Sequence, residues 1–206
     1  RLAAELPGSG HTVIAADLGT SGAARDLVER AGSIDVLVAN AGLSGERADF
    51  TAASDQTIEQ IVRVNLEAPM LLVSAVLPQM IERGSGQIVL VASLAGKVAT
   101  PNALYSSTKS GLRTFGWSLR PKLAKSGVGV TVITPGFIGG AGMFARTGRK
   151  MPPGTMVKLD RYAVKVARAV ERNRSETVIA PPLLRAVSHL GLVWPSLPAA
   201  LLKRGG

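Results

Sequence analysis

The chain has 206 residues and a formal net charge of +10, and 46% of its residues are hydrophobic while 4% are aromatic. It contains no cysteine, which excludes a disulfide framework and a thiolate metal site, and its two histidines, His11 and His189, stand too far apart to form a metal-ligand pattern. No signal sequence opens the chain and no run approaches the roughly 18 apolar residues of a membrane helix, so a single-domain cytoplasmic protein is the first expectation.

The first residues, 1–6, are typical of the end of a helix, and a turn at 7–10 leads into a strand predicted near 12–17. Asp17 ends that strand and is a candidate ligand contact, although aspartate also serves in turns and caps. A helix near 21–31 and a strand near 35–39 follow. The segment after this strand, residues 40–42, begins with Asn40, which suits a turn because asparagine tolerates left-handed geometry.

A long helix is predicted near 54–83, with Ser54 and Asp55 as its start signal and the glycines at 84 and 86 as its stop. Asn65 is a poor residue for a helix interior. Because Pro69 follows it and deletes a backbone donor, we expect a local kink at Asn65 that holds water.

The next strand, near 87–92, leads directly to Ser93, and the carboxyl ends of strands in open α/β sheets are where ligands bind. On the helix predicted near 103–125, Tyr105 and Lys109 are four residues apart and share one face. A tyrosine beside a fixed positive charge has its pKa lowered and becomes a usable proton carrier. The spacing alone is weak, since an exposed helix face also explains it. Pro121 falls inside this predicted helix.

The rest of the chain predicts a strand near 128–133, an irregular lid at 137–160, a helix near 160–172, a strand near 177–180 and a tail at 181–206. Alternating strands and helices indicate an α/β protein with a doubly wound parallel sheet. Arg146, Arg149 and Lys150 form the densest basic group and further basic residues follow along the helix near 160–172, but the charge of the chain is scattered and no aromatic platform accompanies it. We therefore expect a solvated basic face and no nucleic-acid partner.

Five motifs in this order resemble the short-chain dehydrogenase/reductase family: residues 40–42, Asn65, Ser93, the Tyr105–Lys109 pair and Pro135-Gly136. The resemblance extends from about residue 1 to about residue 180 and implies a Rossmann-like sheet. In that family the first strand carries a glycine-rich turn for the cofactor pyrophosphate. No such segment precedes Arg1, so the chain is expected to lack the first two strands and first helix, roughly one βαβ unit.

The resemblance also implies roles for single residues. Tyr105 would exchange a proton with the substrate oxygen, Ser93 would hydrogen-bond that oxygen, Lys109 would hold the nicotinamide ribose, and Asn65 would position a water. The cofactor would be NAD or NADP, with the excess positive charge favouring NADP. Where relatives have a threonine a few residues after Pro-Gly, this chain has Gly140. The implied cofactor contacts are Asp17, Leu18, Asn40, Ala41, Gly42, Tyr105, Lys109, Pro135, Gly136 and Ile138.

The implied function is NAD(P)-dependent hydride transfer between an alcohol and a ketone or aldehyde by a full-length parent, which would be a homodimer or homotetramer. The alternative is a truncated, non-catalytic relative that acts as an interaction module. A basic binding module is disfavoured by the scattered charge. Apolar residues in the lid and tail hint at an apolar small-molecule substrate: Met143, Phe144, Met151, Met156, Leu183, Leu184, Leu192, Val193 and Trp194.

Overall fold

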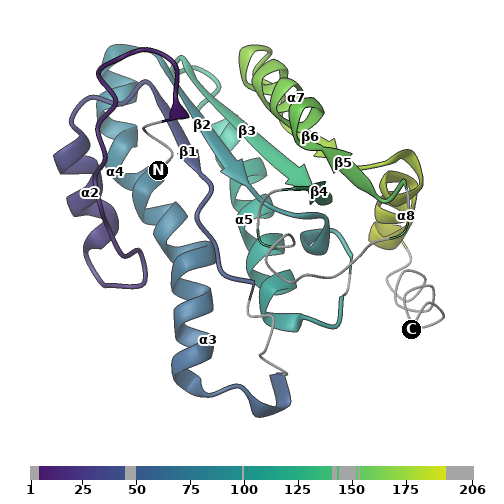
Figure 1. Ribbon diagram of the computed structural model, residues 1–206. Helices are drawn as coiled ribbons and strands as arrows, with labels where there is room; N and C mark the ends of the chain where they lie inside the picture. Colours follow the sequence, from purple (N-terminus) through teal and green to yellow (C-terminus); the bar gives the residue numbers. More distant parts are fainter. Residues whose placement is uncertain are drawn as a thin grey trace.

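The computed structural model describes residues 5–44, 50–98, 100–140, 143, 152 and 154–193, and it shows a parallel sheet with strand order β1-β2-β3-β6 between helices (Figure 1). These strands are β1 (Val36–Ala39), β2 (Gly86–Val91), β3 (Val128–Pro135) and β6 (Glu176–Ile179). Strands β2 and β3 have apolar residues on both faces, as is typical of parallel strands buried on both sides. The predicted α/β fold with a parallel sheet is confirmed.

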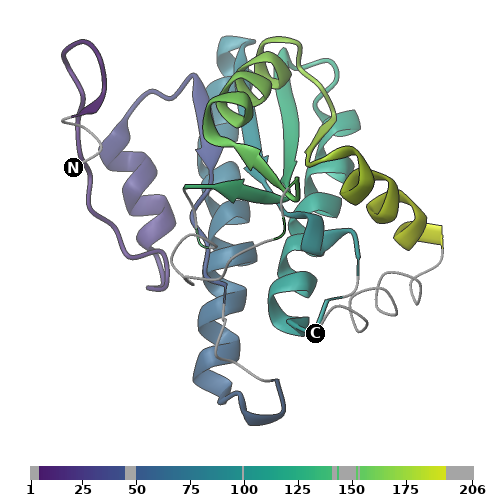
Figure 2. The same cartoon turned by 45° about the vertical axis from the view of Figure 1, so that its right-hand side comes forward.

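Helices cover both faces of this sheet (Figures 1 and 2). Neighbouring residues of a strand point to opposite faces. On β2, Ile88 and Leu90 belong to one core cluster, to which α2 (Ala23–Ala31), α4 (Ala68–Arg83) and α5 (Ala103–Lys122) contribute. Val89 belongs to a second cluster, built with α7 (Leu159–Glu171). The sheet is therefore doubly wound, as predicted.

The long helix predicted at 54–83 consists of three pieces. These are α3 (Asp55–Val62), a π-helical segment (Arg63–Glu67) and α4. The predicted start is confirmed, because the Ser54 side chain accepts a hydrogen bond from the Thr57 backbone N–H. The kink expected at Asn65 takes the form of the π-helical segment, and Pro69 stands in the first turn of α4, where a missing N–H costs little.

Several predictions for single segments were wrong. Residues 11–17 form no strand, and Val13 is 76% exposed, because a strand needs a neighbour for its backbone hydrogen bonds and no described strand lies beside it. The ends of the expected irregular lid pair with each other as β4 (Phe137–Gly139) and β5 (Met156–Lys158). The expected tail begins with α8 (Pro182–Val193). Pro121 does lie inside a helix, as predicted, and is the penultimate residue of α5.

The continuous helix from Asp55 to Arg83 is long and apolar enough to cross a membrane by length and composition, with a mean hydropathy of 1.5 in its most apolar window. The sequence expectation that no segment approaches this threshold therefore needs correction. In the fold, Val73, Val76 and Met80 of this helix are almost completely buried and pack in the core beside the sheet. Its apolar character is thus explained by its place as a core helix.

Candidate active site

Three of the residues singled out by the sequence meet where β2 ends and α5 begins. Ser93 follows β2 and caps the short 3-10 helix Leu94–Gly96, its hydroxyl oxygen accepting a hydrogen bond from the Ala95 N–H at 3.2 Å. Its side chain is also close enough to Tyr105 to affect the pKa of the phenol. The Nζ atom of Lys109 lies 5.9 Å from the centre of the Tyr105 ring. The structure thus brings Ser93, Tyr105 and Lys109 into one site.

The electrostatics of this site differ from the expectation that Lys109 lowers the pKa of Tyr105. Burial raises the pKa of Tyr105, and the Ser93 side chain opposes that rise. Lys109 is 2% exposed and donates a hydrogen bond to the Val91 carbonyl at 2.8 Å. Burial lowers its own pKa to about 8. The expectation was wrong for this arrangement because loss of water around the phenol is the larger effect, and Lys109 does not contribute a resolved opposing effect.

The turn that carries Ser93 is fixed by close packing and by a buried charge cluster. A Cβ atom on Gly96 would lie 2.6 Å from the backbone carbonyl carbon of Lys109, so the turn can rest directly on α5 only with glycine there. The next residue, Lys97, is buried near Glu176, which also accepts hydrogen bonds from Arg113 at 2.9 Å and Thr134 at 2.7 Å. These contacts tie the turn to α5, β3 and β6.

Asn65 is completely buried and holds the loop that follows β1, residues 40–44. Its Oδ1 accepts a hydrogen bond from the Leu43 N–H at 2.7 Å, and its Nδ2 donates to the Leu43 carbonyl at 2.9 Å and to the Thr108 hydroxyl at 3.1 Å. In this structure the side chain therefore acts as a clamp on the 40–44 loop. The predicted water-positioning role remains a prediction.

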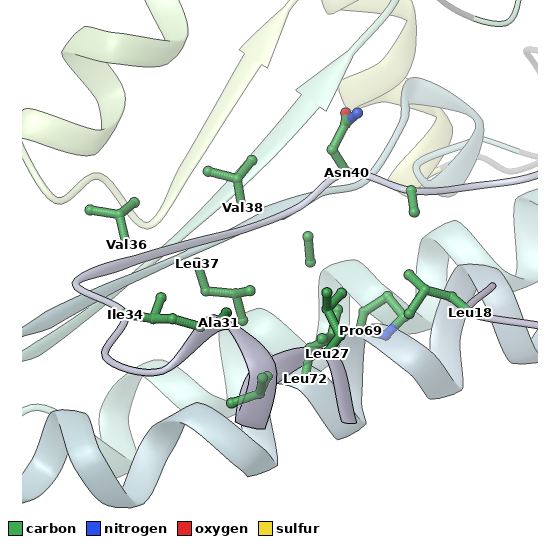
Figure 3. Close-up of a pocket in the computed structure, with 13 residues that line it drawn as sticks. Leu18, Leu27, Ala31, Ile34, Val36, Leu37, Val38, Asn40, Pro69 and Leu72 are labelled. Atoms are coloured by element: carbon green, nitrogen blue, oxygen red, sulfur yellow. The ribbon is translucent and has the colours of Figure 1, made fainter. Parts of the chain in front are cut away.

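Three of the predicted cofactor residues before α3 line a pocket of about 400 Å³ between α2, β1 and α4 (Figure 3). Leu18, Asn40 and Ala41 contribute to its wall, and the remaining lining is mostly aliphatic. Asp17 lies next to this wall, and its Oδ1 accepts a hydrogen bond from the Gly19 N–H at 2.9 Å. The turn role that the sequence left open for Asp17 is therefore the one seen here.

The remaining predicted cofactor residues follow β3. Pro135 ends that strand, Gly136 donates a backbone hydrogen bond to Ile179 at 3.0 Å, and Ile138 pairs with Val157. Because the sheet is parallel, the carboxyl ends of β1, β2 and β3 lie at the same edge. Asn40 and Ser93 come shortly after β1 and β2 and Pro135 ends β3, so all three residues lie at this edge. Of the apolar candidates, Phe144, Met151 and Trp194 and the side chains of Leu192 and Val193 lie outside the described residues.

One residue with a central place was not singled out by the sequence argument. Asn102 caps α5, with its Oδ1 accepting a hydrogen bond from the Tyr105 N–H at 3.1 Å. Its Nδ2 donates to the carbonyl of Ser44 at 2.6 Å. An asparagine three residues before Tyr105 is a helix-start signal that could have been found, but the partner in the 40–44 loop has no local sequence signal.

Known proteins resemble this chain in sequence. The profile of the short chain dehydrogenase family matches residues 1–151. The ketoacyl reductase HetN of Nostoc sp. is 35% identical over 174 residues, which are 82% of this chain and 58% of that protein. A dehydrogenase/reductase SDR family protein 7-like of Anopheles gambiae is 32% identical over 192 residues, covering 89% of this chain and 60% of that protein. The chain thus spans well under two thirds of these relatives.

Solved structures share the fold. An alcohol dehydrogenase from Comamonas testosteroni, described as specific for bulky-bulky ketones, superposes with a TM-score of 0.71 over 92% of this chain and 71% of its own, at 23% identity. A short-chain dehydrogenase from Sphingobium yanoikuyae in complex with NADPH gives a TM-score of 0.72 over 91% and 72%, also at 23% identity. At this level of identity the likeness supports the fold alone.

Proposed function

The chain belongs to the short-chain dehydrogenase/reductase family, and on this premise we propose that the whole protein interconverts an alcohol and a ketone or aldehyde with NAD or NADP. The observation that carries the proposal is the meeting of Ser93, Tyr105 and Lys109 at the carboxyl end of β2. The alternative, a non-catalytic interaction module, has no need for a buried lysine beside a partly buried phenol. Burying an ammonium group is costly when its partner is a neutral carbonyl, as the Val91 carbonyl is here.

A nicotinamide cofactor would supply the hydride, and several residues of this chain suit its binding. Gly42 is the clearest sign of fit, because a Cβ there would lie 3.4 Å from Lys109 Nζ and 3.2 Å from Asn65 Oδ1. Its absence leaves space beside the ammonium group, where Lys109 would hold the ribose hydroxyls. Leu18, Asn40 and Ala41 would line the adenine end, with Asp17 beside them. NADP is favoured over NAD by the net charge of +10.

Proton transfer in this proposal belongs to Tyr105. Because burial raises its pKa, the phenol is protonated at neutral pH and is ready to donate to a carbonyl oxygen during reduction. Ser93 would hydrogen-bond the same oxygen as negative charge develops on it. Lys109 adds positive potential 5.9 Å from the ring, and Asn65 would position the water that relays protons onward.

Replacing Tyr105 by phenylalanine tests this assignment in the whole protein. Tyr105→Phe keeps the ring but removes the proton carrier, so kcat should fall by at least about 100-fold while cofactor affinity changes little. Tyr162→Phe is the matched control, since it alters the other tyrosine of the chain, on α7. If Tyr105→Phe kept more than about a tenth of wild-type turnover on an accepted alcohol, the proton-transfer role would have to be abandoned.

A dimer or tetramer is also proposed for the whole protein, in a cytoplasmic location. The motive is the outer surface of the long helices, where Val62, Ile81 and Trp117 are 38%, 47% and 40% exposed. Symmetric pairing of α4 and α5 with a second copy would cover such residues. Light scattering of the whole protein at tens of micromolar would contradict the proposal if it gave the mass of one subunit.

A further inference from the structure

The two ends of the Tyr105 backbone are tied to two adjacent residues of the 40–44 loop, the amide end to Ser44 and the carbonyl end to Leu43. On the amide side, the Tyr105 N–H donates to Asn102 Oδ1, and Asn102 Nδ2 donates to the Ser44 carbonyl. On the carbonyl side, the Thr108 hydroxyl donates to the Tyr105 carbonyl at 2.9 Å and accepts from Asn65 Nδ2, and Asn65 clamps Leu43. Two asparagines on different elements therefore connect one tyrosine to adjacent loop residues.

The contact of Asn102 with Ser44 exceeds what a helix cap requires. A cap uses a side-chain oxygen to accept a backbone N–H in the first turn, and the Oδ1 of Asn102 already does this. The Nδ2 donor reaches a carbonyl 58 positions away in sequence, at 2.6 Å, which is a close contact for an N–H···O hydrogen bond. An aspartate or serine would cap α5 equally well, but neither has the amide donor.

We propose that Asn102 is a positioning residue that couples the 40–44 loop to the place of the Tyr105 phenol. This inference rests on the proposed function, because it takes Tyr105 as the proton carrier. Asn40 and Ala41 of the same loop belong to the proposed cofactor wall, and Gly42 lies beside Lys109. When a bound cofactor fixes this loop, the position of Tyr105 is therefore fixed as well. Asn102 connects the two on one side, and Asn65 and Thr108 connect them on the other.

The test separates the cap from the tether with three variants of the whole protein. Asn102→Ser and Asn102→Asp both keep a capping oxygen and delete the amide donor. The serine variant adds no charge, whereas the aspartate variant adds a negative charge. Asn102→Ala deletes both. Ser54→Ala removes the cap of α3, far along the chain from Tyr105, and serves as the control for loss of a cap alone. The readouts are melting temperature, kcat and KM over a pH series, and hydrogen–deuterium exchange of the 40–44 loop.

If Asn102 is a tether, Asn102→Ser and Asn102→Asp should both lower kcat by about 10-fold, because small misplacements of a catalytic group have large effects on rate. Their substrate KM should change by less than about twofold and their melting temperatures should stay near wild type. The 40–44 loop should exchange faster in both variants while the first turn of α5 keeps its protection. Ser54→Ala should lower the melting temperature and leave kcat unchanged.

The inference is overturned if Asn102→Ser and Asn102→Asp have wild-type kcat and loop exchange and only Asn102→Ala melts early, since Asn102 is then a cap and nothing more. It is also overturned if only the charged Asp variant loses activity. If the wild-type whole protein turns over no alcohol or carbonyl substrate, the proposed function fails. Loop exchange in Asn102→Ser would still decide whether the tether exists.

Discussion

The two sides of the sheet around β1 and β2 differ in how completely this chain fills them. On the β2–α5 side, Asn65, Thr108 and Lys109 are all buried, and each has a hydrogen-bond partner. At the edge strand β1, Val36 and Val38 are 49% and 54% exposed and border the pocket of Figure 3. The residues around the proposed proton-transfer site are thus packed and hydrogen-bonded within this chain, while side chains at the proposed cofactor wall are exposed to solvent.

The composition of the two core clusters explains why Val36 and Val38 of β1 are exposed. Leu37 and Ala39 of β1 pack into the cluster made with α2 and α4. Val36 and Val38 point to the opposite face, where the cluster built with α7 reaches β2 and β3 but not β1. Apolar side chains of a parallel strand are normally covered on both faces. The face of β1 that carries Val36 and Val38 is therefore the part of the sheet that the described residues of this chain leave exposed.

The largest effect expected from this difference concerns cofactor binding. The 206-residue chain on its own should bind NAD or NADP at least about 100-fold more weakly than a protein extended at its N-terminus by a strand and helix beside β1, because the adenine wall is half formed. Titration calorimetry on both proteins measures the ratio. Equal micromolar affinity in the two proteins, from monodisperse samples, would show that the exposed face of β1 does not matter.

A second prediction concerns the packed region between β2 and α5 and uses the burial of Lys109. Its folded pKa of about 8 lies below its ordinary value of 10.5. Between these values the unfolded chain holds a proton that the folded protein has lost, so raising the pH favours the folded state. From pH 7 to pH 9.5 the whole protein should gain about 2 kcal/mol of unfolding free energy relative to Lys109→Met.

Urea unfolding of both proteins at the two pH values gives this difference. Lys125→Met, which removes an exposed lysine just beyond α5, is the matched control for loss of an ammonium group. A difference between wild type and Lys109→Met that stays constant with pH would mean that Lys109 is not desolvated in the folded protein. Water would then reach Lys109 in the folded protein, despite the hydrogen bond that its ammonium group makes to the Val91 carbonyl.

Sequence reasoning succeeded where a local pattern determines the structure and failed where a distant partner does. Apolar runs predicted β2 and β3, and the capping signal at Ser54 predicted the start of α3. The strand expected at 12–17 failed because its pairing depends on a neighbour. The pKa direction of Tyr105 failed because burial, which cannot be read from a four-residue spacing, outweighs the nearby charge. The contact between Asn102 and Ser44 was missed because the two residues are 58 positions apart in sequence.

The smallest expected effect, and the one that distinguishes the two sides most directly, comes from Val38→Lys. In the 206-residue chain alone, Val38 is more than half exposed, so the substitution should change the unfolding free energy by no more than about 0.5 kcal/mol. It should also reduce self-association, because a lysine on exposed β-structure opposes pairing with a second chain. Urea unfolding and light scattering of the isolated chain measure the two effects.

The same substitution should be much more destabilising in a protein extended to cover β1. There Val38 would be buried over Val89, its completely buried partner in register on β2, and a lysine would lose hydration without gaining a partner. A destabilisation of at least about 2 kcal/mol is then expected. Val164→Lys, at an exposed position on α7, is the control for adding charge at an apolar site. If Val38→Lys were equally harmless in both proteins, the face of β1 would be solvent-exposed in the whole protein too, and the cofactor wall would have to be completed elsewhere.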